Sequence, residues 1–186
     1  MYGVIGEDPS DVETLRILIK RLANNDKLSV LVKGYGGCGE MLRKGASQLK
    51  LFSDKGVARF VVCYDADRSD PAAREVEARQ KIWNKALADG IHGRCCIVVP
   101  VQELEAWILA DLSSVSKIIT SWTPKDVASP ELINDPKEHL ERLSRQHQKP
   151  KYIHAVHNQK IALHLDLAKV AAKCSSFVPL KEFVTN

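Results

Sequence analysis

The sequence lacks several patterns that would place it in a common class. None of its five cysteines forms a CxxC pair, so the spacing gives no reason to expect a zinc site. No apolar run approaches the roughly 20 residues that a membrane-spanning helix needs, and no signal peptide precedes the first apolar segment. No internal repeat or low-complexity tract is present. These absences favour a cytoplasmic globular protein with no membrane partner.

The chain also lacks a strong excess of charge of either sign. Its 186 residues carry a formal net charge of +4, which is compatible with a nucleic-acid partner without requiring one. The length suits one α/β domain with a substantial core and is short for two. We therefore expect one domain and an extension.

What is present is an alternation of apolar runs and amphipathic segments. The runs predict strands, and the segments between them predict helices at 10–24, 40–52 and 71–89. The four expected strands are residues 2–6, 28–33, 57–64 and 95–101. This order predicts an α/β fold with a mostly parallel four-stranded sheet flanked by helices.

Helix starts can be predicted from capping residues. Ser10 stands three residues before Glu13, a capping box that would begin the first helix. Asp70 or Ser69 is expected to cap the helix that begins at Pro71.

The character of the sequence changes after residue 112. No strong strand run follows, prolines punctuate a polar stretch, and helices are expected at about 136–146, 158–173 and 176–184. We predict an α/β core over residues 1–112 and a helical C-terminal extension over 113–186 that packs on it.

Acidic residues follow three of the predicted strands. Glu7 follows the first, Asp65 and Asp67 the third, and Glu103 and Glu105 the fourth. The carboxyl ends of parallel strands meet at one edge of the sheet, where α/β folds bind ligands. Asp65 and Asp67 would face the same way in an extended segment. Clustered carboxylates suit Mg²⁺ or Mn²⁺, so this edge is a candidate metal site.

Of the two acids that follow the fourth strand, only one can face the site if both lie on a helix. On a helical wheel Glu105 falls among apolar residues while Glu103 points away, which favours Glu105 as the functional acid and leaves a buried salt bridge as the alternative. Asp11 is included among the candidate ligands, although a lone acid there is typical of a helix cap. The neighbouring Trp107 is expected in the core.

The ordered set of Glu7 and the Asp65-Ala66-Asp67 motif resembles the Toprim domain of topoisomerases, primases and overcoming-lysogenization-defect (OLD) nucleases. Residues 7–11 (EDPSD) are similar to the Glu-Gly-Pro-Ser-Asp opening of OLD-type Toprim nucleases. Residues 105–111 (EAWILAD) and 162–177 resemble segments of small stand-alone Toprim-like proteins of unassigned function. Asp8 departs from the glycine of that opening and would add a charge near the first ligand.

The resemblance implies Mg²⁺-dependent hydrolysis of phosphodiester bonds in nucleic acid. It implies that Glu7 and the Asp65/Asp67 pair bind the metal, with Glu7 alternatively a general base or acid. Related nucleases use a lysine to stabilise charge in the transition state, a role that Lys160 could fill. Many OLD-type Toprim domains work with an ATPase, which implies an ATPase partner in phage or plasmid defence.

A basic strip in the extension could hold the nucleic-acid backbone. Its residues are Arg142, Arg145, Lys149 and Lys151. A solvated helix face explains the same strip as well. His154 and His157 share a helical face and could contact phosphate, with a solvated surface as the favoured interpretation.

Other functions stay open. Residues 34–39 (GYGGCG) match G-x-G-x-x-G after a strand and before a helix, the context of a dinucleotide site, although that interpretation leaves the other acids unexplained. A phosphohydrolase of small nucleotides and a non-catalytic Toprim-like interaction subunit are further alternatives, and assembly into a homo-oligomer stays open.

Overall fold

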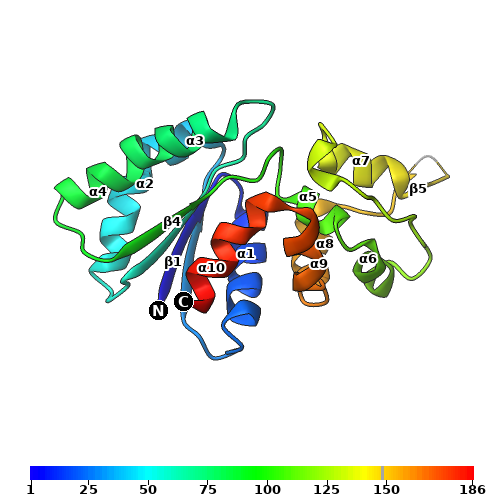
Figure 1. Ribbon diagram of the computed structural model, residues 1–186, viewed down its shortest axis with the longest axis horizontal. Helices are drawn as coiled ribbons and strands as arrows, with labels where there is room; N and C mark the ends of the chain where they lie inside the picture. The colour runs from blue at the N-terminus through cyan, green and yellow to red at the C-terminus, as the bar shows by residue number, and fades with distance from the viewer. Residues whose placement is uncertain (148) are drawn as a thin grey trace.

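The fold is built on a parallel sheet of four strands in the order β2-β1-β3-β4. The computed structural model describes residues 1–147 and 149–186. The strands are β1 (Tyr2–Gly6), β2 (Val30–Gly34), β3 (Arg59–Cys63) and β4 (Arg94–Val98). Helices cover both faces of this sheet (Figure 1). The predicted α/β class, parallel sheet and helical C-terminal part are confirmed.

The strands are joined by helical crossovers. These are α1 (Pro9–Leu22), α2 (Cys38–Ser53), and a third connection made of α3 (Pro71–Ala78), the π-helical η1 (Arg79–Asn84) and α4 (Lys85–Ala88). The residues at both junctions of the third connection have helical backbone angles, so the three pieces form one continuous helical segment. This agrees with the single helix predicted at 71–89.

The start of α1 differs from the prediction. The helix begins at Pro9, and the Oδ1 of Asp8 accepts a hydrogen bond of 2.6 Å from the Ser10 N–H. Proline has no N–H to satisfy and its fixed φ suits the first helical position, so Asp8 is the cap. The Ser10 capping box was therefore wrong, whereas Asp70 caps α3 as predicted.

The C-terminal part is mostly helical and contains one small hairpin. Its elements are α5 (Glu105–Leu109), α6 (Leu112–Ile118), η2 (Pro130–Leu132), α7 (Pro136–Leu143), β5 (Arg145–Gln146), β6 (Lys149–Pro150), α8 (His154–Ala162), α9 (Leu167–Lys173), η3 (Ser175–Phe177) and α10 (Val178–Thr185). The prediction of a single helix over residues 158–173 is wrong, because α8 ends at Ala162 and α9 begins at Leu167. Asp166 caps a new helix there, accepting hydrogen bonds from Ala168 and Lys169.

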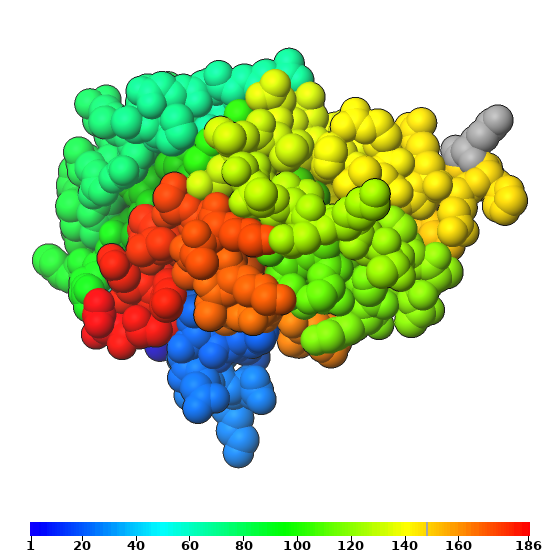
Figure 2. Space-filling model, turned by 45° about the vertical axis from the view of Figure 1, so that its right-hand side comes forward, coloured from blue at the N-terminus to red at the C-terminus, as the bar shows by residue number. Residues whose placement is uncertain are grey.

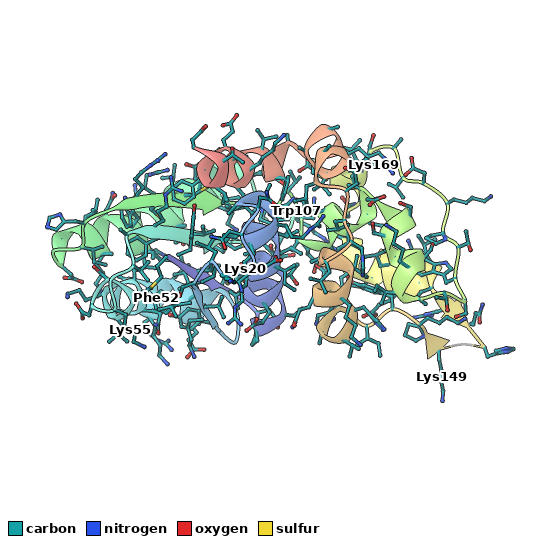
Figure 3. The ribbon with its side chains drawn as sticks, turned by 90° about the horizontal axis from the view of Figure 1, so that it is seen from below. Lys20, Phe52, Lys55, Trp107, Lys149 and Lys169 are labelled. Carbon is teal, nitrogen blue, oxygen red and sulfur yellow. The ribbon has the colours of Figure 1, made fainter. Side chains whose placement is uncertain are left out.

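Two hydrophobic cores lie on opposite faces of the sheet. Alternate residues of β3 divide between them, with Val61 on the α1 side and Val62 on the α2 side. The α1 core continues into the C-terminal helices, and Figure 2 shows these helices, in orange and red, packed beside α1. Trp107, fully buried in this core, lies near the middle of the molecule in Figure 3. The division at residue 112 stays a prediction.

Within the described residues, no helix has both the length and the apolar character to cross a membrane.

Candidate metal and phosphate site

An acidic pocket of about 280 Å³ lies at the carboxyl edge of the sheet. It is lined by residues that follow β1, β2, β3 and β4, and by residues of the helices α1, α5, α7 and α8. Its lining residues are Glu7, Asp8, Asp11, Tyr35, Gly36, Gly37, Asp65, Asp67, Glu103, Glu105, Lys137 and His154. The predicted ligands Glu7, Asp11, Asp65, Asp67 and Glu105 are thus brought into one cavity.

Glu7 and Asp65 meet because β1 and β3 are neighbouring parallel strands. Ile5 pairs with Val62, so the residues that follow the two strands lie beside each other. The N–H of Asp65 donates a 3.1 Å hydrogen bond to Oε1 of Glu7. Burial raises the pKa of Glu7, and the hydrogen bond from Asp65 opposes this shift. Glu7 is therefore positioned by the backbone of the neighbouring strand.

One carboxylate oxygen of Asp65 has no hydrogen-bond partner among the described residues. This oxygen, Oδ1, is also inaccessible to solvent. Burial, followed by the charges of Asp11 and Glu105, raises the pKa of Asp65 well above the usual range. Asp67 is exposed and has a φ of 45°, and its N–H donates to the carbonyl of Gln102 over 3.1 Å. Both aspartates line the pocket, although Asp67 lies beyond the extended segment that was expected to orient the pair.

Asp11 and Glu105 form the deeper acidic wall. Asp11 is 8% exposed and Glu105 is 3% exposed, and burial raises the pKa of both carboxyls. Asn158 donates a 2.9 Å hydrogen bond to Oε1 of Glu105, and Tyr152 donates to the amide oxygen of Asn158. The buried Glu105 agrees with the helical wheel, and its partner is an amide.

Glu103 also lines the pocket, contrary to the prediction that it would point away. The helical wheel does not apply to it because α5 begins only at Glu105. Glu103 accepts hydrogen bonds from the Lys137 Nζ over 3.0 Å and from the Lys137 N–H over 3.1 Å. Burial opposes protonation of this lysine, but the contact with Glu103 prevails and raises the Lys137 pKa.

The donor set fits a hard divalent cation. Among the described residues the lining contains seven carboxylates and one lysine, and that lysine is already paired with Glu103. Carboxylate oxygens are the ligands that Mg²⁺ and Mn²⁺ prefer, and the unpartnered Asp65 Oδ1 offers an open lone pair. Within residues 1–147 and 149–186, no group of three His, Cys, Asp or Glu side chains is arranged to hold an ion as placed. Ligation of one ion by three of these side chains would need them to adopt other rotamers.

The other predicted functional residues lie outside the pocket lining. Lys160 is exposed near the end of α8, and Lys137 is the lysine that reaches the pocket. The basic strip lies on α7 and the β5-β6 hairpin, where Arg142, Arg145 and Lys149 are exposed and the Lys151 Nζ contacts Ser121 Oγ at 2.5 Å. Figure 3 places Lys149 at one end of the molecule, far from Phe52 beside the sheet.

The glycine loop after β2 forms part of the pocket wall. A Cβ on Gly34 would lie 2.5 Å from the Pro9 backbone, and Gly37 has a φ of 115°, so both positions need glycine. The Gly36 N–H donates to Glu40 Oε2 over 3.1 Å, and the Gly37 N–H donates to the Glu7 carbonyl over 3.0 Å. The N–H groups of both glycines that line the pocket therefore already donate hydrogen bonds within the protein.

The segment over residues 105–111 ties the pocket to the C-terminal helices. The Trp107 Nε1 donates to Ser176 Oγ over 2.9 Å, which confirms a core role for this ring. Asp111 is buried and accepts hydrogen bonds from Ser113, Ser114, the Asp166 N–H and Lys169. Although burial acts to raise it, these bonds lower the Asp111 pKa to about 2. Asp111 is thus a structural acid.

Three pocket residues were missed or undervalued from the sequence: Tyr35, Lys137 and His154. Lys137 and His154 lie more than 30 residues beyond Glu105, the last acidic residue of the pocket lining, and no local pattern connects them to the sheet edge. Tyr35 follows β2 directly and is 5% exposed. Burial, and then the charge of Glu40, raises its pKa to about 12, so its hydroxyl carries a proton at neutral pH.

Comparison with known families gives one match. The model of the family described as "Domain of unknown function (DUF4276)" matches residues 6–184, which include the whole pocket lining. Searches of curated proteins and of solved structures gave no match.

Proposed function

The chain belongs to the DUF4276 family, whose description assigns no activity, and from the site we propose a Toprim-type, metal-dependent phosphodiesterase that acts on nucleic acid. One observation carries this proposal: seven carboxylates from three separate segments of the chain line one pocket, and a buried oxygen of Asp65 has no partner among the described residues. Such a cluster is costly without a cation. The resemblance of Glu7 and the Asp65-Ala66-Asp67 motif to Toprim domains supplies the substrate class.

We assign the metal to Glu7, Asp65 and Asp67, with Asp11 and Glu105 completing the acidic wall. A divalent cation held there would lower the pKa of a water molecule and withdraw charge from the phosphate. Glu7, fixed by the Asp65 N–H, is placed to accept a proton within the pocket. Lys137 is the lysine positioned to stabilise negative charge, in place of Lys160.

The exposed basic strip on α7 and the hairpin would hold the polymer outside the pocket. An ATPase partner in phage or plasmid defence, as OLD-type Toprim proteins have, is part of the proposal. In that case the isolated chain binds metal and nucleic acid, and the partner controls cleavage.

The test is incubation of the pure protein with labelled DNA, tRNA and ribosomal RNA in Mg²⁺, Mn²⁺ or EDTA. We expect metal-dependent products from the wild type and none from the Asp65→Asn/Asp67→Asn variant. Asp70→Asn is the matched control, because it removes one charge nearby while asparagine still caps α3. Identical products from the wild type and the double variant would refute hydrolysis at this site. A wild type that stays inactive with its ATPase partner present, together with partner binding retained by the double variant, would favour the non-catalytic interaction subunit.

A further inference from the structure

Buried polar atoms without partners are concentrated at the acidic pocket. Among the described residues, the side-chain atoms of this kind are Ser10 Oγ, Arg16 Nε, Tyr35 Oη, Asp65 Oδ1 and His154 Nδ1. The last three belong to residues that line the pocket. Buried polar groups in proteins nearly always have a partner, because an unmade hydrogen bond is costly. A cavity that gathers three such atoms is suited to a ligand that satisfies them.

Tyr35 is the most constrained of the three residues. Its ring is packed in the α2-side core with 5% of the residue exposed, so the hydroxyl cannot turn away to reach bulk water. A protonated phenol donates one hydrogen bond, and the neighbouring carboxylates do not take it. The hydroxyl therefore offers a fixed donor on the sheet side of the pocket.

His154 lies on the opposite part of the fold. It is the first residue of α8, and its Nδ1 is buried without a partner, whereas the Nδ1 of His157 on the next turn contacts the Ile153 backbone. The ring can present a proton at Nδ1 to a ligand. Tyr35 and His154 thus bring two hydrogen-bonding groups from different halves of the chain to one cavity that is otherwise acidic.

The pocket has room for a phosphate group together with a hydrated metal ion, since its volume is about 280 Å³. An acceptor-rich phosphate satisfies both donors, and metal on the carboxylates removes the repulsion between phosphate and the acidic wall.

Resting on the proposed function, we propose that Tyr35 and His154 bind the non-bridging oxygens of the scissile phosphate. The carboxylates hold metal at one side of that phosphate, and these two side chains fix its orientation from the other. Recognition through phosphate oxygens carries no base information, so the substrate is the nucleic-acid backbone independent of sequence.

The test uses the full chain in saturating Mg²⁺ and titrates inorganic phosphate by calorimetry, with KM for labelled nucleic acid as a second readout. Tyr35→Phe keeps the ring and removes only the hydroxyl, so we expect phosphate affinity to fall roughly tenfold to a hundredfold. Its metal-free melting temperature should be equal to or above that of the wild type, because an unpartnered buried hydroxyl is removed. His154→Ala should weaken phosphate similarly, and His154→Asn, whose amide can replace Nδ1, should restore part of the affinity.

Tyr64→Phe is the matched control. The Tyr64 hydroxyl donates to Glu77 over 2.8 Å and lies outside the pocket lining, so its loss should lower stability and leave phosphate binding unchanged. If Mg²⁺ binds through Asp65 but Tyr35→Phe and His154→Ala both keep full phosphate affinity, this inference is overturned while the metal site stands. If Mg²⁺ fails to bind, both proposals fall.

Discussion

Replacing Asp65 by asparagine should make the metal-free protein more stable. The Asp65 Oδ1 is buried without a partner, and burial with the charges of Asp11 and Glu105 disfavours its ionised form. Asparagine removes the buried charge, and its amide N–H₂ can donate to a neighbouring carboxylate, so the substitution should recover the cost of the unsatisfied polar group, about 1–3 kcal/mol. For a chain of 186 residues, each 1 kcal/mol shifts the melting temperature by about 2–4 °C. We expect Asp65→Asn in EDTA to melt about 2–12 °C above the wild type.

When metal is added, the wild type should have a higher melting temperature than Asp65→Asn. A ligand present at about 100 times its Kd stabilises a protein by about 2.7 kcal/mol, a gain that Asp65→Asn should largely lose. Differential scanning calorimetry in EDTA and in Mg²⁺ measures both effects, with Asp70→Asn as the control. A lower melting temperature for Asp65→Asn in EDTA would mean that the carboxylate has a structural partner, and equal Mg²⁺ stabilisation would exclude Asp65 as a ligand.

The stability difference should also depend on pH with a defined sign. Because the folded-state pKa of Asp65 is raised, its contribution to stability is fully present below the unfolded-state pKa and is lost as pH rises through the folded-state pKa. The stability advantage of Asp65→Asn over the wild type in EDTA should therefore be larger at neutral pH and should narrow as pH falls toward the ordinary aspartate pKa of 3.8. A stability difference between the two proteins that grows as pH falls would contradict a raised pKa for Asp65.

The remaining predictions concern the framework and the basic strip. Asp111→Asn should cost about 2 kcal/mol at neutral pH in urea unfolding, because the folded-state pKa falls from 3.8 to about 2; this depressed pKa makes the difference disappear as pH drops through that range. Gly34→Ala should destabilise the protein by about 2 kcal/mol or more since its Cβ would overlap the start of α1, whereas Gly39→Ala meets no atom within 4 Å and should be neutral or stabilising in thermal unfolding. The Arg145→Ala/Lys149→Ala pair should reduce the slope of nucleic-acid affinity against salt by about 2 in fluorescence anisotropy; an unchanged slope would show that the strip is only solvated.

The sheet was predictable because its strands are short apolar runs separated by amphipathic segments. Residues 57–64 identified the central β3, and the acids after the strands followed from sheet geometry alone. The less accurate predictions were local choices between competing signals. At the start of α1, Asp8 and Ser10 both resemble caps, and Pro9 decides in favour of Asp8.

The far wall of the pocket could not be predicted because it depends on tertiary packing. Lys137 and His154 reach the pocket only because the C-terminal helices pack on the α1 face of the sheet. The prediction for Glu103 failed for a related reason. A helical wheel assumes a helix, but Glu103 lies before the start of α5, and its side chain contacts Lys137. Local periodicity contains no information on such long-range pairs.

The division of the pocket between the sheet and α7 has a consequence for local unfolding. Of the eight residues of α7, only Pro136 and Leu140 are buried, so little apolar area holds this helix and its Lys137 in place. Segments with few buried contacts open at lower free energy than the core of a protein. We therefore expect the α7 wall of the acidic cavity to open at a lower free energy than the sheet, so that on warming the pocket loses its shape before the sheet melts.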